Sequence, residues 1–218
     1  MALNEGRAGP VLLAEGAVGP QRQGRQGEAS VADIHGRYTE AALRGTIYSA
    51  FLKGATTVAA GQQDNAAAAA STNFAILNPQ SSGVTLALLK FQVAWHSGTP
   101  VAGPITHAVI VGSTITITGS APIRNKAGAG PLSAAQYVTS AGGTAVTGGT
   151  APVLLRPSGL YMTATAPAPV AIITATELLD GDIILPPGTA WLPLFPNGTW
   201  TSPVFSLGVE WEELPYVV

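Results

Sequence analysis

The chain has 218 residues, a formal net charge of −2 and no cysteine; 46% of its residues are hydrophobic and only 10% are charged. The hydrophobic content excludes a globally disordered chain, and the lack of cysteine excludes disulfides, a thiol nucleophile and a zinc–thiolate site. Its 26 Gly and 17 Pro, with few helix-forming charged residues, favour short strands separated by turns. We therefore expect an all-β protein whose folding buries roughly 70% of the surface of the unfolded chain.

Charge is distributed unevenly along the chain. Residues 65–176 contain no Asp or Glu, and the charged residues there are Lys90, Arg124, Lys126 and Arg156. Acid–base catalysis and the binding of hard metal ions need carboxylates or a well-placed histidine. This distribution predicts that the chain is not an enzyme and holds no cofactor or metal ion.

Residues 1–45 form a predicted N-terminal arm. Up to about residue 36, Gly and Pro occur among Gln, Arg and Glu, so this segment cannot build a core of its own. It is either a disordered leader or an extended arm that becomes ordered on a neighbouring subunit. The second interpretation would bury its scattered apolar residues, which are Val11, Leu12, Leu13, Val18, Val31 and Ile34.

The composition of the arm and of the rest of the chain also bears on partners. The mixed charges of the arm lack the basic footprint of a nucleic-acid-binding protein, so we expect no nucleic-acid partner. No export signal is evident and no run of about 18 apolar residues occurs, so we expect no membrane segment.

A short helical turn is expected where the arm ends. Residues 38–44 place Glu40 and Arg44 four positions apart, as in a helical ion pair, and Gly45 follows as a C-cap. Residues 46–52 then alternate, with Ile47 and Phe51 on one face and Tyr48 on the other, which predicts the first strand.

Residues 46–218 are predicted to form a β-sandwich of the jelly-roll type, because short apolar segments recur with turn signals about every ten residues. The clearest strands are 84–96 and 205–212. Their expected apolar faces are Leu89, Phe91, Val93 and Trp95 in the former, and Phe205, Leu207, Val209 and Trp211 in the latter. Further strand-like segments lie at 72–77, 105–111, 113–118, 153–156, 160–166, 170–179, 183–185 and 190–195. A Gly/Ala/Thr-rich stretch at about 119–151 indicates a long loop inserted into this domain.

The histidines and the Asp-Gly-Asp segment of the body each admit two interpretations. His96 and His107 are either ordinary strand histidines or a metal-binding pair on neighbouring strands. Asp180 and Asp182 either flank a turn or contribute to a calcium site. The structural interpretation is favoured in both cases.

Two further groups of side chains were candidates for carbohydrate chemistry or binding. Glu210 and Glu212 point to the same side of the last strand, whereas a glycosidase pair faces across a cleft. We interpret them as a solvated or interface-lining strand edge. Trp191 and Trp200 either belong to the core or form a platform on which a sugar stacks.

Two segments are similar to virion structural proteins of tailed bacteriophages: residues 35–45, with the sequence HGRYTEAALRG, and residues 209–215, with the sequence VEWEELP. This resemblance implies a capsid cement (decoration) or fibre-type protein, commonly a trimer of jelly-roll subunits in a virion assembled in the host cytoplasm. The implied partners are further copies of the chain and the major capsid protein or other virion proteins. The candidate assembly contacts are Arg37, Tyr38, Glu40, Arg44, Glu210 and Glu212.

The scarcity of charge in the predicted sandwich also favours an oligomer. Monomeric β proteins guard exposed strand edges with charged side chains, so we expect neighbouring subunits to cover the edges of this one. A tail or head-to-tail structural protein fits the same observations. A carbohydrate-binding receptor module that uses Trp191 or Trp200 is the alternative from another class.

Overall fold

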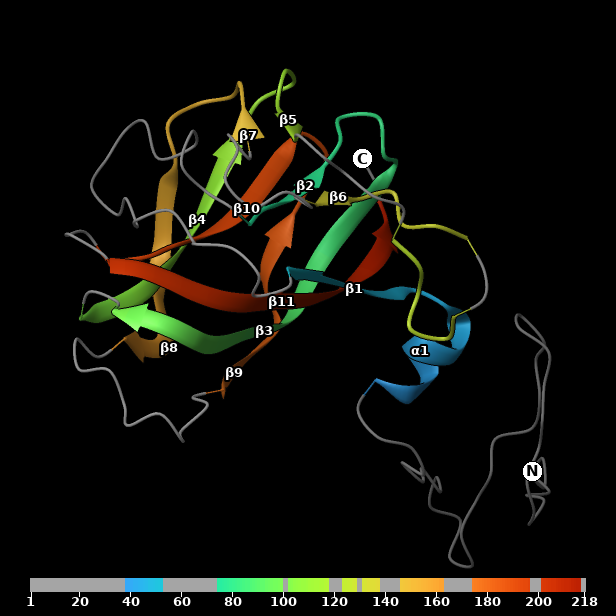
Figure 1. Ribbon diagram of the computed structural model, residues 1–218. Coiled ribbons are helices and arrows are strands. Elements are labelled where there is room, and N and C mark those ends of the chain that lie inside the picture. Colours follow the sequence, from blue (N-terminus) through green and yellow to red (C-terminus); the bar gives the residue numbers. More distant parts are fainter. Residues whose placement is uncertain are drawn as a thin grey trace, which may run out of the picture. The chain divides into compact units, whose positions relative to one another are not determined.

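The computed structural model describes residues 38–52, 74–99, 102–117, 123–128, 131–137, 146–162, 174–196 and 201–216. The chain divides into two units, residues 1–40 and 41–218, and the described strands all belong to the second (Figure 1). Most of the predicted arm and much of the predicted 119–151 loop lie outside the described residues.

The described part of the chain contains one short helix followed by strands. These elements are α1 (Thr39–Arg44), β1 (Ile47–Leu52), β2 (Ile76–Asn78), β3 (Val84–Thr99), β4 (Gly103–Val111), β5 (Thr116–Ile117), β6 (Gln136–Tyr137), β7 (Val146–Thr147), β8 (Val153–Met162), β9 (Thr174–Leu185), β10 (Thr189–Leu194) and β11 (Thr201–Pro215). The predicted helical turn is confirmed as α1, and Gly45 ends it with a φ of 76°, a conformation that favours glycine.

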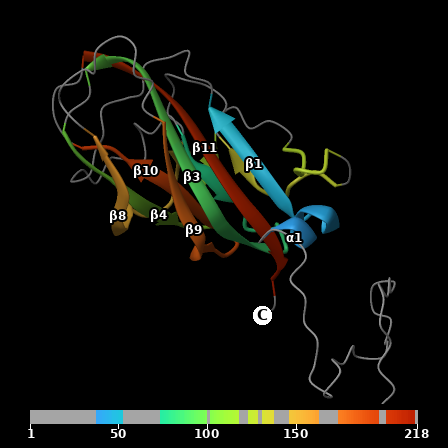
Figure 2. The same cartoon turned by 90° about the horizontal axis from the view of Figure 1, so that it is seen from below.

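Two antiparallel sheets carry the fold, and we call them the first and the second sheet. The strand order is β1-β11-β3-β9 in the first sheet and β6-β2-β10-β4-β8 in the second. The pairs β1·β11, β2·β10, β3·β9 and β4·β8 are nested, so the first half of the chain pairs with the second half in reverse order. This nesting is the jelly-roll arrangement. The predicted fold class is therefore confirmed, and Figure 2 shows β1, β11 and β3 side by side.

The hydrophobic core lies between the two sheets. Its largest fully buried side chains are Phe74, Ile76, Leu86, Leu88, Phe91, Ile105, Leu185, Trp191, Phe205 and Trp211. Phe91 and Trp191 meet edge to face with ring centroids 5.3 Å apart, which places an aromatic contact between β3 and β10. The period of two in β11 is confirmed, because Phe205, Leu207, Val209 and Trp211 are all buried in this core.

The opposite face of the second sheet is apolar as well. It buries a second cluster made of Ala75, Leu77, Ala108, Ile110, Ala190, Leu192 and Leu194. Ile115 and Val146, which precede β5 and begin β7, pack against this cluster. The segment inserted between β4 and β8 thus contributes apolar cover, which explains why every residue of β10 is buried.

Two bulges correct the predicted strands. The register of β3 against β11 shifts between Leu88 and Lys90, so Leu89 is an additional residue and Leu88 joins Phe91 on the core face. Segments 170–179 and 183–185 were predicted as separate strands, and their described residues, from Thr174 on, belong to the single strand β9. Asp180 and Gly181 interrupt its ladder with φ values of 51° and 84°, which is the turn expected there.

Two other boundaries differ from the sequence prediction. Segment 153–156 and the described part of segment 160–166, which ends at Met162, join in one strand, β8, whose register against β4 shifts twice. The strand expected at 113–118 is reduced to the two residues of β5, which pair with β7 in a small separate ribbon. In both cases the apolar pattern located a strand, and tertiary pairing set its ends.

Candidate functional site

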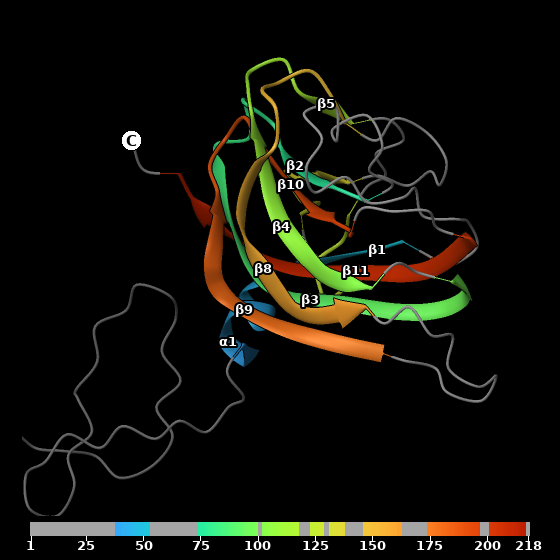
Figure 3. The same ribbon diagram turned by 90° about the vertical axis from the view of Figure 1, so that its left-hand side faces the viewer.

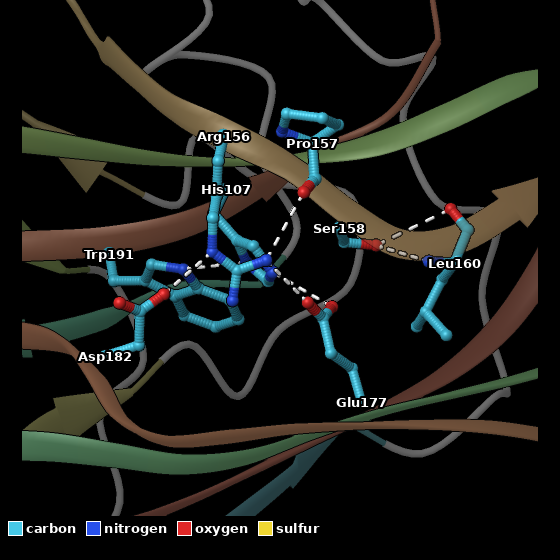
Figure 4. Close-up of polar contacts among 8 residues, drawn as sticks. All are labelled: His107, Arg156, Pro157, Ser158, Leu160, Glu177, Asp182 and Trp191. Carbon is cyan, nitrogen blue, oxygen red and sulfur yellow. Dashed lines mark hydrogen bonds and ion pairs between the residues drawn. The ribbon is translucent and has the colours of Figure 1, made fainter.

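The described residues bring charged and aromatic side chains together where the two sheets meet beside β8 and β9. We call His107, Arg156, Glu177, Asp182 and Trp191 the edge cluster (Figure 4). His107 comes from β4 and Trp191 from β10 of the second sheet, whereas Glu177 and Asp182 come from β9 of the first. Arg156 lies on β8, so the edge cluster links the two sheets through side chains.

The position of His107 follows from strand alternation. Its neighbour Ala108 belongs to the second apolar cluster, on the face of the second sheet away from the core. Because side chains alternate along a strand, His107 points between the sheets. There it is fully buried, with Phe91 and Trp191 packed against the ring at centroid distances of 5.7 Å each. A polar ring at such a site needs a partner for each of its nitrogens.

Both nitrogens of His107 have partners, and these partners define its protonation state. The indole Nε1 of Trp191 lies 3.2 Å from Nδ1, and an indole N–H can only donate, so Nδ1 must accept and carries no proton. The proton is therefore on Nε2, which donates to Glu177 Oε2 at 3.0 Å. Burial lowers the pKa of His107 below its ordinary value, against the opposing effect of Glu177. His107 is neutral in this arrangement.

Glu177 is the centre of the edge cluster. Its Oε2 accepts from His107, and its Oε1 accepts from Arg156 Nη1 at 2.8 Å. Burial alone would raise the pKa of Glu177, but the hydrogen bonds from Arg156 and His107 and the backbone N–H of Gly159 outweigh it, so the pKa is lowered. The carboxylate is ionised, and both of its oxygens accept hydrogen bonds.

Asp182 has a weaker role in the edge cluster. It accepts from Arg156 Nε at 2.9 Å, but its side chain is 62% exposed, against 10% for Glu177. Solvent screens such an exposed pair. Arg156 is therefore held mainly by Glu177, with Asp182 fixing the orientation of the guanidinium plane.

The geometry does not suit acid–base chemistry. Both ring nitrogens of His107 are occupied by protein groups, so the ring cannot take a proton from a substrate without breaking one of these contacts. The hydroxyl of Ser158, the nearest serine along β8, accepts from the backbone N–H of Leu160 at 2.9 Å rather than contacting the histidine. The edge cluster holds the sheets together.

The two predicted histidines have different partners. His96 lies on β3 and contacts Ser206 Oγ at 2.7 Å, while His107 contacts Glu177 and Trp191. Within the described residues, no group of three or more His, Asp and Glu side chains is arranged to hold a metal ion.

Glu210 and Glu212 do not lie on a strand edge, because β11 runs between β1 and β3; that expectation is wrong. Glu210 forms ion pairs with Lys90 at 3.5 Å and with Lys126 at 2.8 Å. Glu212 accepts from the hydroxyl of Thr46 at 3.3 Å. Both carboxylates therefore have partners within the chain.

The other candidate assembly contacts lie at the start of the described residues. Tyr38 is half-buried and Arg44 is exposed, whereas Arg37 and the side chain of Glu40 lie outside the described residues. A role of all six candidates in assembly stays a prediction.

The burial of the tryptophans tests their interpretation as a sugar-binding platform. Trp191 is fully buried, so the interpretation of this residue as a sugar-stacking platform is wrong. Trp211 is fully buried and Trp95 packs partly buried against the core, as expected. Trp200 lies outside the described residues.

Sequence reasoning missed Arg156 and Glu177 as a site. A signal was available, since a lone charged residue inside an otherwise neutral strand needs an opposite charge when it is partly buried. Lys90 and Arg156 lie on strands and pair in this way with carboxylates that follow residues 65–176, and Lys126, in a turn, pairs with one of the same carboxylates. The sequence does not reveal the register of the strands, and the register determines which carboxylate contacts which cation.

Comparison of the chain with protein-family models, with curated proteins and with solved structures gives no match. Among the described residues, no helix has the length and apolar character needed to cross a membrane.

The two carboxylates of the edge cluster should differ in their contribution to stability. We expect Glu177→Gln to lower the free energy of unfolding by about 1–3 kcal/mol, because a neutral amide offers one acceptor oxygen to two donors, of which His107 is fully buried. Asp182→Asn, the matched control on the same arginine, should cost less than about 1 kcal/mol because the pair is exposed. Urea denaturation of both variants measures the difference, and equal losses would contradict the central role of Glu177.

Proposed function

We propose that the chain is a structural component of a bacteriophage particle, a capsid cement (decoration) protein that stabilises the shell through contacts between subunits. The jelly-roll fold and the resemblance of residues 35–45 and 209–215 to phage virion proteins support this proposal. The observation that carries it is the exposed apolar surface along the edge strands of the sandwich.

That surface is most pronounced on β8, the edge strand of the second sheet. Val153, Leu154 and Leu155 are consecutive, and their exposed fractions are 53%, 49% and 45%. Edge strands of monomeric proteins are commonly guarded by charge, but Arg156, the charged residue of β8, is bound to Glu177 and Asp182. A partner surface would remove these apolar side chains from water.

The neighbouring edge strand β9 adds to the same region of the molecule. It belongs to the first sheet and exposes Leu178 and Ile184, with exposed fractions of 58% and 48%. Figure 3 shows β8 and β9 beside each other, and the two strands are in contact. Pro157 and the register shifts of β8 oppose the addition of another strand. The partner is therefore held by side-chain packing, as between the subunits of a cyclic trimer.

The apolar side chains exposed on β8 and β9 should determine the oligomeric state. We expect the full chain to form a trimer in sedimentation velocity and native mass spectrometry, and Leu154→Asp to shift it to monomers, because burying a carboxylate at the interface is costly. The control Leu214→Asp places the same change at an exposed leucine of β11 and should leave the trimer intact. Circular dichroism checks that both variants fold. A monomeric wild type, or a trimer of Leu154→Asp, would contradict this use of the edge.

The position of the chain on the particle tests the function itself. Antibodies against the purified chain should label the heads of phage particles in immunogold electron microscopy. Label on the tail or at the head–tail junction would replace the cement function by that of a tail or head-to-tail component. Particles without label would contradict a virion function altogether.

A further inference from the structure

His107 holds the two sheets together through contacts that depend on its protonation state. Its Nδ1 accepts from Trp191 on β10, and its Nε2–H donates to Glu177 on β9. Trp191 thus fixes the proton of the ring on the nitrogen that faces the opposite sheet. A neutral ring satisfies both partners at once.

A second proton on the ring cannot be accommodated in this geometry. It would have to bind Nδ1, where the indole N–H of Trp191 already points at 3.2 Å. Two donors would then face each other in a fully buried site, and the indole offers no lone pair to accept. The charged ring must leave its position, and this movement also breaks its bond to Glu177.

We propose that His107 is an acid-sensitive latch, whose protonation releases β8 and β9 at the edge of the sandwich while the rest of the fold stays closed. The proposal concerns the subunit itself and does not depend on the phage function. Its basis is the contact geometry of His107, Trp191 and Glu177.

The groups that face His107 set the pH range of the latch. Glu177 and Asp182 from β9 favour the charged ring, whereas Arg156 from β8 opposes it; the rings that β10 and β3 place against it, Trp191 and Phe91, carry no charge. Burial is the largest effect and lowers the pKa of His107 below the ordinary value of 6.5. An opened state therefore binds the proton more readily than the closed one. The latch is fully effective above about pH 6.5 and weakens as pH falls towards the lowered pKa.

The edge strands are the elements that such a release would free. Each has one partner in its own sheet, β4 for β8 and β3 for β9. Glu177 receives both His107 and Arg156, so loss of the histidine contact weakens the hold between β9 and the second sheet. Local opening follows the elements with the fewest partners. β11, by contrast, is paired on both sides and should stay closed.

Hydrogen–deuterium exchange of the full chain between pH 7.5 and 5 tests the latch. After correction for the intrinsic exchange rate, the protection of β8 and β9 should fall by up to about tenfold per pH unit below about pH 6.5. The protection of β1 and β11 should not change. This range lies above the ordinary pKa of 4.5 for Glu177, so carboxylate titration contributes little to the change.

Two histidine variants identify the titrating group. His107→Gln should abolish the pH response of β8 and β9, while His96→Gln, a change at an exposed strand histidine, should keep it. Nitrogen-15 NMR of the wild type should also show the ring of His107 protonated on Nε2 and not on Nδ1 at pH 7.5, a readout that needs no variant. The proposal is overturned by wild-type protection independent of pH, by the same response in His107→Gln, by equal loss over all strands, or by the opposite tautomer.

Discussion

The pairing of β3 with β11 is the constraint on which the rest of the structure depends. It joins the two halves of the chain in the middle of the first sheet, and its register fixes which side chains face the core. Phe91 and Val209 meet on the inner face, so Lys90 and Glu210 meet on the outer one. A shift of one residue would turn the side chains of one strand to the opposite face and bury its charge, so the two charges would no longer meet. Two of the nested pairs, β1·β11 and β3·β9, flank this contact in the first sheet, and the other two lie in the second sheet.

In the described part of the chain, the ion pairs connect segments of the chain to one another. Lys90 and Lys126 bind Glu210, which ties the insertion between β4 and β8 to the first sheet, and Arg156 binds Glu177 at the junction of the sheets. Contacts within the chain therefore explain part of the low charge of residues 65–176. Apolar side chains of the insertion also cover the outer face of the second sheet. The apolar side chains exposed on β8 and β9 are not explained in this way. These exposed side chains support the proposal that a partner covers the two strands.

Much of the fold could be predicted from the sequence, because a period of two survives in β3 and β11 and proline and glycine punctuate the strands. The bulge at Leu89 could not, since an extra residue is visible only against its partner strand. At Asp180 the turn was expected, but the pairing of both flanking segments with β3 was not. The edge cluster was missed for the same reason. His107 and Glu177 lie far apart in the chain, and the burial of Trp191 depends on both sheets closing over it.

We propose that the β8–β9 edge of this sandwich is apolar because neighbouring subunits cover it. Cryo-electron microscopy of the assembled phage particle tests that claim most directly. We predict density for the chain on the shell as a trimer, with Val153, Leu154 and Leu155 packed against an adjacent subunit. A complete particle in which this edge faces solvent, or in which the chain occurs as isolated monomers, would contradict the claim.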